Sequence, residues 1–294
     1  MIHYSCCPVC QSNQIQPKLT SKDHTVSQQS FGIWYCSDCT LCFTQDIPGQ
    51  DSIGVFYASS DYISHSDTKE GIINRLYHLV RKRTLASKKT LVVSVTGTNR
   101  GNVLDIGCGT GAFLHAMKAA GWTITGLEPD PSPRAKAMEL YAVNPQEPGR
   151  LFELPVATFA AITMWHVLEH VHELHAYLKR TGELLAPGGK LFIAVPNYTS
   201  ADAKAYKEYW AAWDVPRHLY HFSPGSMERL LSLHGMKLES VRPMWFDSFY
   251  VSMLSEKYRG GNIIRAFLNG LLSNLNAIGN HRKCSSVIYI ISKK

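Results

Sequence analysis

A glycine-rich turn between an apolar strand and a helix constrains the fold of this chain more than any other feature. The stretch VLDIGCGTGAFL, residues 103–114, begins as a buried strand, turns at three glycines and continues as a helix. Glycine lets the backbone approach a ligand closely and adopt a positive φ angle. Further strand–helix units follow at intervals of roughly 20–25 residues, and such alternation predicts a parallel, doubly wound sheet.

The spacing within this turn narrows the ligand that it can hold. The glycines at 107, 109 and 111 follow G-x-G-x-G, whereas a dinucleotide fingerprint is G-x-G-x-x-G, and no P-loop G-K-[ST] is present. The Asp105 carboxylate before them would repel a pyrophosphate but accept from an ammonium group or a bound water. Glu128 ends the next strand, where a carboxylate accepts hydrogen bonds from ribose hydroxyls. The pattern predicts an adenosine ligand with positive charge and little phosphate, a description that S-adenosylmethionine meets.

Four stretches resemble the successive motifs of the class I S-adenosylmethionine-dependent methyltransferases. They are VLDIGCGTGAFL, GLEPD, MWHVLEHV and LLAPGGKLFIAVPN, within residues 100–240. The resemblance implies an α/β fold, a Rossmann-like doubly wound sheet of seven strands with the last strand antiparallel. It also implies S-adenosyl-L-methionine as the cofactor.

The same resemblance implies the residues that bind the cofactor. The glycine turn would line its methionine part, Glu128 its ribose, and the residues after the fourth strand its adenine or sulfonium. An aromatic face beside a sulfonium also has a cation–π rationale. The expected set is Asp105, Gly107, Cys108, Gly109, Gly111, Phe113, Glu128, Pro129, Trp165 and His166. The third strand has little signal, and Glu153 is a weak candidate for the acidic residue that contacts adenine.

Four cysteines near the beginning of the chain have the spacing of a zinc site. Cys7-x2-Cys10 and Cys36-x2-Cys39 are two pairs separated by 25 residues, which suits a tetrahedral zinc ion with four thiolate ligands. Four thiolates leave no open position for catalysis, so the expected zinc is structural. Cys6 is left over because only Cys7 has the x2 spacing to Cys10.

These features divide the chain into three parts. We expect residues 1–45 to form a small zinc-ribbon-like module, with a short strand at FGIWYC. Residues 46–98 would be a linker followed by an amphipathic, basic helix at 71–90, and residues 99–294 the methyltransferase domain. The module and the methyltransferase motifs together resemble sugar C-methyltransferases and, alternatively, ribosomal RNA base methyltransferases with a zinc ribbon.

Absent motifs narrow the methyl acceptor. The chain has MWHV where amino-group methyltransferases carry [DN]-P-P-[FY], and it has no Pro-Cys pair for attack on cytosine C5. These absences leave an oxygen or carbon acceptor on a small molecule, or a nitrogen acceptor that is activated in another way. We expect the oxygen or carbon acceptor, including one on a sugar nucleotide or a lipid-linked precursor. Two alternatives stay open: a ribosomal RNA base methyltransferase that uses the zinc module for RNA binding, and a non-enzymatic S-adenosylmethionine-binding protein.

Methyl transfer to oxygen or carbon also needs a general base, and histidine is the usual one near neutral pH. The candidates are His166 and His221, then Glu169, His170, His218 and Tyr220. A helix is expected after the strand near 159–164, and on it His166 and His170 would be one turn apart and share a face. They do not make the H-E-x-x-H of a metal site. The aromatic segment 210–222 would cover the acceptor site, and Arg217 within it could receive an acidic group.

Composition and charge limit the cellular setting and the partners. The chain has 294 residues, 45% hydrophobic, no apolar run of signal-peptide or membrane-span length, and a net charge of +7. We expect a cytoplasmic protein that acts on a small molecule, with nucleic acid as the less favoured partner. The apolar helix at 261–276 would pack in the core, or form a homodimer or membrane-surface contact.

Overall fold

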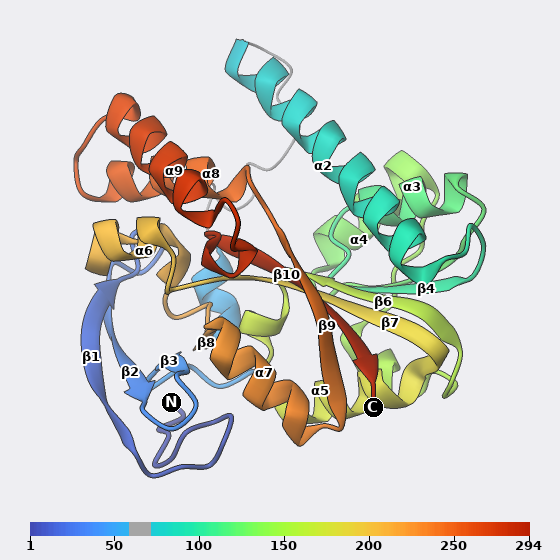
Figure 1. Cartoon of the computed structure of the whole chain (residues 1–294), viewed down its shortest axis with the longest axis horizontal. Coiled ribbons are helices and arrows are strands. Elements are labelled where there is room, and N and C mark those ends of the chain that lie inside the picture. Colours follow the sequence, from blue (N-terminus) through green and yellow to red (C-terminus); the bar gives the residue numbers. More distant parts are fainter. Residues whose placement is uncertain (59–71) are drawn as a thin grey trace.

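A mixed sheet of six strands forms the centre of the molecule. The structure is a computed structural model that describes residues 1–58 and 72–294. The strand order is β5-β4-β6-β7-β10-β9, and the sheet crosses the middle of the view in Figure 1. The strands are β4 (Asn102–Ile106), β5 (Thr123–Leu127), β6 (Phe159–Trp165), β7 (Leu185–Pro196), β9 (Met236–Pro243) and β10 (Ser286–Lys293). Neighbours from β5 to β7 are parallel, and β10 is antiparallel to both β7 and β9.

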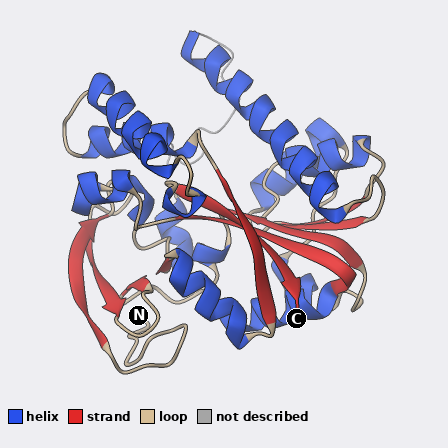
Figure 2. Cartoon of the chain, in the orientation of Figure 1, coloured by secondary structure: helices blue, strands red, loops and turns tan. Residues whose placement is uncertain are grey.

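Helices cover both faces of this sheet, as the alternating sequence pattern predicts (Figure 2). The crossover helices are α3 (Ala112–Ala119), α4 (Pro131–Tyr141), α5 (Leu174–Leu184) and α7 (Pro224–Leu233). Local sequence sets where they begin: the Asp130 side chain accepts from the Ser132 amide before α4, and Ser223 caps α7 in the same way. Both helices carry proline at the first position, where a missing N–H has no cost.

The prediction of seven strands is wrong, because the third strand does not form. In its place Gln146 makes a single bridge with Leu127, and the 3-10 helix η2 (Pro148–Phe152) follows. Pro145 and Pro148 lie on either side of this bridge. Proline has no N–H to donate to a ladder, so pairing stops after the two hydrogen bonds of Gln146, with Glu128 and Gly126.

The expected basic helix is α2 (Ile72–Thr96), which runs six residues further than the sequence pattern indicates. Its second half packs against the sheet and α3 through Leu85, Leu91 and Val92. Lys82 and Arg83 are exposed, as a basic outer face requires. In the expected linker the structure places the 3-10 helix η1 (Ile53–Tyr57), while residues 59–71 and the side chains of 72–79 and 81 lie outside the described part.

The N-terminal module has a second sheet, which a distant segment completes. Strands β1 (Ile15–Lys22), β2 (Ser30–Cys36) and β3 (Cys42–Thr44) are antiparallel neighbours, and β8 (Tyr220–His221) pairs with β3 at the edge. Side chains of the module share one buried cluster with those of the central sheet, Phe43 and Phe222 among them. The segment 210–222 is therefore built into the interior between the two sheets rather than lying over the surface as a flap.

Two helices, α8 (Asp247–Tyr258) and α9 (Ile263–Ala277), form a hairpin inserted between β9 and β10. Figure 1 shows them at the top of the view, beside α6 (Ala201–Tyr206). The remaining short helices are η3 (Leu168–His170), η4 (Lys207–Tyr209), η5 (Ala211–Trp213) and η6 (His281–Lys283). Throughout residues 1–58 and 72–294, the helices lack the combination of length and apolar character that a bilayer span requires.

Candidate functional site

The glycine turn after β4 has an open side that could accept a ligand. Gly107, Gly109 and Gly111 have φ angles of 69°, 54° and 75°, a region that L side chains rarely adopt. A Cβ on Gly107 would lie 2.5 Å from Val167, and one on Gly111 would lie 3.1 Å from Ala137. At Gly109 a Cβ would meet no atom within 4 Å. Two of the glycines are therefore needed for packing, and the third borders open space.

Two buried carboxyl groups lie beside this turn. Asp105 accepts a 2.6 Å hydrogen bond from Thr163 on the neighbouring strand, and burial raises its pKa to about 7. Glu128 accepts from the Gly109 amide at 2.8 Å and from the Asp130 amide at 3.0 Å, and burial raises its pKa as well. The structure thus brings together the two acidic residues that the sequence predicts, with Glu128 directly bonded to the turn.

A cation already lies against the aromatic face predicted to border a sulfonium. The Lys88 Nζ, from α2, is 4.5 Å from the centre of the Trp165 ring, and Phe113 contacts the same ring edge-on at 5.5 Å. Burial lowers the pKa of Lys88, and the negative charges of Asp247 and Asp105 oppose that shift. The sequence did not single out Lys88, because there this residue is one of several basic residues on the helix expected at 71–90.

The other expected cofactor residues surround this centre at different depths. Cys108 and Phe113 are buried in the core that α3 makes with the sheet, whereas Pro129 is exposed. Glu153, the weak candidate for adenine, is exposed and forms an ion pair with Arg150. Direct ligand contact is therefore open to Pro129 but requires rearrangement at Cys108 and Phe113.

His166 lies at the end of β6 with a φ angle of 59° and is not helical. Because α5 begins only at Leu174, the expectation that His166 and His170 share a helical face is wrong. The His166 Nε2 is 3.0 Å from Asp247, and its Nδ1 is 3.5 Å from Glu169. Burial opposes protonation of this ring, but the two carboxylates outweigh it and raise the His166 pKa to about 9. In this state His166 is a hydrogen-bond donor at neutral pH.

Glu169, His170 and His218 form a compact group with the donor atoms of a metal site. One ligand atom from each lies within 4.8 Å of the others. Among the described residues, the carboxylate oxygens of the buried Glu169 accept no hydrogen bond of good geometry, and one of them forms the ion pair with His166 at 3.5 Å. The Nδ1 atoms of His170 and His218 face the carbonyls of Arg217 and Ala212 at 3.0 and 2.9 Å. The sequence argument against a metal missed this group because His218 comes from a distant segment.

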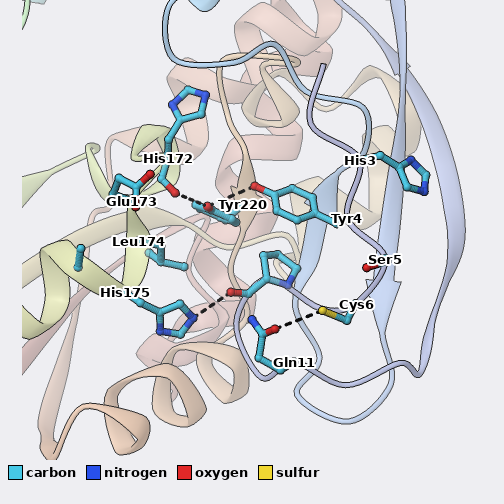
Figure 3. Close-up of a pocket in the computed structure, with 12 residues that line it drawn as sticks. His3, Tyr4, Ser5, Cys6, Gln11, His172, Glu173, Leu174, His175 and Tyr220 are labelled. Atoms are coloured by element: carbon cyan, nitrogen blue, oxygen red, sulfur yellow. Dashed lines mark hydrogen bonds between the residues drawn. The ribbon is translucent and has the colours of Figure 1, made fainter.

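The remaining catalytic candidates lie against the N-terminal module. The His221 Nε2 is 3.1 Å from the Thr44 hydroxyl, and burial holds the His221 pKa well below its usual range. The Tyr220 hydroxyl donates to the His172 carbonyl at 3.2 Å. It lines a hollow of about 270 Å³ between the module and the larger domain, together with Tyr4 and His175 (Figure 3). None of the expected cofactor residues lines this hollow.

The Arg217 side chain is already paired within the protein. Its guanidinium is 1% exposed and bonds Asp23 of the module at 3.1 Å and Asp214 at 2.6 Å. Asp23 also accepts from the amide and hydroxyl of Ser27, and these bonds with Arg217 overcome burial and hold its pKa below the usual range. The expectation that Arg217 receives an acidic group of the acceptor is wrong, because its charge already joins the module to segment 210–222.

The four predicted zinc ligands converge. The Sγ atoms of Cys7 and Cys39 are 3.5 Å apart and those of Cys10 and Cys36 are 3.6 Å apart, and all four lie within 4.8 Å of one another. A Zn–S bond of ~2.3 Å in a tetrahedron places sulfur atoms ~3.8 Å apart. The donor set therefore fits zinc, and Cys6 is directed instead to Gln11.

The doubly wound sheet, with its glycine turn and an acidic residue beside each of two adjacent strands, defines the methyltransferase fold. The sequence matches the family described as "Methyltransferase domain" over residues 77–241, more than half of the chain. The chain belongs to this family.

Curated relatives cover only part of the chain. The Xanthomonas axonopodis pv. citri protein named ubiquinone biosynthesis O-methyltransferase is 29% identical over 160 residues, or 49% of this chain and 66% of that protein. The mitochondrial protein of the same name from Homo sapiens is 27% identical over 168 residues, or 50% of this chain and 44% of that protein. The match thus spans less than two thirds of these relatives' own length.

Solved structures share the fold at low identity. Magnesium protoporphyrin IX methyltransferase of Synechocystis PCC 6803, in a structure with bound SAH, has a TM-score of 0.54 and 15% identity, covering 83% of this chain and all of that one. The cyclase SpnF has a TM-score of 0.50 and 17% identity, covering 70% of this chain and 80% of that one. One fold thus serves proteins named for different reactions.

Proposed function

We propose that this protein is an S-adenosylmethionine-dependent methyltransferase that acts on a small molecule. The observation that carries the proposal is the open face at Gly109, bordered by the buried carboxyls of Asp105 and Glu128 and followed along the sheet by Trp165. When bound, the cofactor supplies a sulfonium methyl group that an acceptor displaces in line. Asp105 would hold its ammonium group, Glu128 its ribose hydroxyls, and Trp165 would offer an aromatic face to the positive sulfur.

We propose an oxygen acceptor, in keeping with the O-methyltransferase names of the curated relatives. Those names specify methyl transfer to oxygen in ubiquinone biosynthesis, and we propose for this chain a hydroxyl on a lipid-linked precursor, one of the acceptor classes that the sequence leaves open. Carbon transfer remains the alternative for this site.

His166 is our preferred residue for taking the acceptor's proton. Its pKa is raised because the carboxylates of Asp247 and Glu169 face the ring. A positive ligand beside Trp165 would lower the His166 pKa, because like charges disfavour the protonated form. That shift moves the imidazole toward the neutral state that a general base requires. Asp247 and Glu169 would hold the ring in one orientation throughout.

We also propose that Cys7, Cys10, Cys36 and Cys39 hold a structural zinc ion. The metal would fix the turns that carry both cysteine pairs, and through β3 it would support β8 and Arg217. The zinc would act through folding, since its four thiolates leave no position for an acceptor. Zinc is thus expected to contribute to stability more than to the chemistry.

Calorimetric titration with S-adenosylhomocysteine tests the cofactor site. We expect micromolar binding that Asp105→Ala or Glu128→Ala weakens at least tenfold. Glu239→Ala is the matched control, because this carboxylate is exposed on β9, at the opposite edge of the sheet from β5, and it should leave the affinity unchanged. A folded wild-type protein that does not bind the ligand would remove the cofactor site from this proposal.

Methyl transfer is then tested with radiolabelled S-adenosylmethionine and a panel of catechols with short prenyl tails, sugar nucleotides and ribosomal RNA. Product with a catechol supports oxygen transfer to a lipid-linked ring. Transfer to RNA alone would replace this function with the nucleic-acid alternative. Cofactor binding without transfer to any cell extract would support a non-enzymatic protein.

A further inference from the structure

We propose that the α8–α9 hairpin is a docking surface for an anionic phospholipid bilayer. The helix α9 exposes large apolar side chains along its length. They are Ile263, Ile264, Phe267, Leu268, Leu271, Leu272, Leu275 and Ile278, each between 37% and 69% exposed. At ~180 Å² for a large side chain, about half exposed, they present on the order of 800 Å² of apolar surface, above the ~300–600 Å² of the largest patch on a typical monomer.

The residues on the buried face of α9 are small, and this explains why the large apolar side chains face outward. The buried residues are Ala266, Gly270, Ser273 and Ala277. A Cβ on Gly270 would lie 2.8 Å from Phe249 of α8, so only glycine allows the two helices to approach this closely. An ordinary surface helix buries its large apolar side chains and exposes its polar ones. In α9 the large apolar side chains face away from the protein.

Hydrogen bonds fix this rotation of the helix. Ser273 donates to the buried Asp202 at 2.5 Å, and the Asn269 amide donates to the Tyr206 hydroxyl at 2.9 Å. Asn262 caps the first turn. Turning α9 to hide its apolar face would break the two bonds to Asp202 and Tyr206 of α6 and leave the Asp202 carboxylate without this donor. The exposed face therefore belongs to the folded state and needs an external partner.

The patch continues onto the residues that lead into α8. Trp245 and Phe246 are 36% and 45% exposed, and Met253 is 41% exposed. The Trp245 carbonyl accepts from Asn274 of α9, which places this aromatic pair beside the last turns of that helix. Tryptophan and phenylalanine at the edge of an apolar face are typical of helices that lie in the membrane interface.

Charge selects a membrane over a second copy of the chain. From Lys257 to Lys283, a stretch that spans α9 and both its ends, the sequence contains five lysines and arginines and no aspartate or glutamate. Lys257, Arg259 and Arg265 lie at one end of α9, and Arg282 and Lys283 lie just beyond the other. Arg259 pairs with Glu256 and Arg282 pairs with Glu228, so the five bases outnumber the two carboxylates and both ends keep a positive charge. Two such faces would repel each other, whereas anionic headgroups attract basic residues that flank an apolar face. At 15 residues, α9 is shorter than the ~20 residues that a membrane span needs, so its apolar face can meet a bilayer only from the surface.

The docking surface is connected to the candidate active site. The first residue of α8, Asp247, is the partner of His166 at 3.0 Å. A bilayer that holds α8 and α9 would therefore lie next to the place where we put the acceptor, and could deliver a lipid-soluble one. This last step rests on the proposed function, whereas membrane binding itself does not.

Vesicle flotation of the full chain tests the surface. We expect the protein to float with vesicles of phosphatidylcholine and phosphatidylglycerol, at least tenfold less with phosphatidylcholine alone, and less as salt rises. The double variant Leu268→Ser/Leu272→Ser should lower flotation at least tenfold. Leu140→Ser/Leu233→Ser is the matched control, because these leucines are 49% and 45% exposed on α4 and α7. It should float like the wild type.

Each other outcome would overturn the proposal. Wild-type protein that stays unbound with anionic vesicles, or a double variant that still floats, would show that α9 does not dock on lipid. A mass that doubles with concentration in light scattering, without flotation, would make the face a dimer contact. If the double variant does not fold, Arg265→Glu tests the same claim, and flotation equal to wild type would contradict it. The affinity for S-adenosylhomocysteine is measured in parallel on the same proteins. It tests the cofactor site separately, so a failure of membrane binding can be told apart from a failure of the proposed function.

Discussion

Two alanine substitutions in the glycine turn separate its packing role from its binding role. An alanine at either Gly107 or Gly109 adopts a left-handed conformation, which costs ~1–2 kcal/mol and is partly offset by the stiffer unfolded chain. At Gly107 the new Cβ also lies 2.5 Å from Val167, and overpacking adds ~1–3 kcal/mol. We expect a loss of about 2–4 kcal/mol for Gly107→Ala and about 1 kcal/mol for Gly109→Ala.

For ligand binding we expect the opposite order: Gly109→Ala, which costs less stability, should lose more affinity than Gly107→Ala. The Cβ of Gly109→Ala meets no protein atom within 4 Å, so it enters the space that we assign to the ligand and should weaken S-adenosylhomocysteine at least tenfold. Thermal unfolding should show a drop of roughly 5–10 °C for Gly107→Ala and a few degrees for Gly109→Ala. Adding Val167→Ala to Gly107→Ala should restore part of the loss. Equal destabilisation by both variants, or full affinity in Gly109→Ala, would refute the geometry of the turn.

Three further predictions follow. Because the Asp105 pKa is about 7 in the free protein, binding of an ammonium group should release a proton and tighten from pH 6 to pH 8. Calorimetry in buffers of different ionisation enthalpy measures this proton release. Proton uptake would contradict the prediction, and so would a wild-type affinity that depends on pH as little as that of Asp105→Asn. Lys88→Met should tighten S-adenosylmethionine several-fold relative to S-adenosylhomocysteine, since the ammonium no longer competes for Trp165; an unchanged ratio in paired titrations would count against this. Elemental analysis should find one zinc per chain, lost in Cys10→Ser with a lower melting temperature and kept in Cys6→Ser. Loss in both would reject the ligand set.

Much of the fold could be predicted because local sequence determines it. The helix expected at 261–276 is α9, which begins at Ile263 after its Asn262 cap and ends at Ala277. The prediction of a third strand was wrong for a reason that is also local: two prolines limit this segment to a single bridge. The helix α8 was missed because its buried residues are mostly serines and one glutamate, so its sequence lacks the apolar period that reveals a surface helix.

The candidate site was predictable where one short motif supplies it. The glycine turn, Asp105 and Glu128 come from two consecutive strand ends, so spacing alone places them together. Three further site residues come from distant segments, and only the tertiary structure brings them to their partners. Lys88 meets Trp165, Asp247 meets His166, and His218 meets Glu169. Arg217 was misjudged because its partner Asp23 belongs to the other module, which no local pattern reveals.

The pairing of β8 with β3 has a consequence for synthesis on the ribosome. The edge of β3 ends at Thr44, and its partner begins at Tyr220, so the strand waits for 176 more residues. At ~5–20 residues per second this is a delay of roughly 10–35 s. An unpaired strand edge invites pairing with other chains, and the three-residue length of β3 keeps that edge short. The cysteine pairs are complete from the start of this interval, so metal capture would hold the nascent module in shape until its last strand emerges.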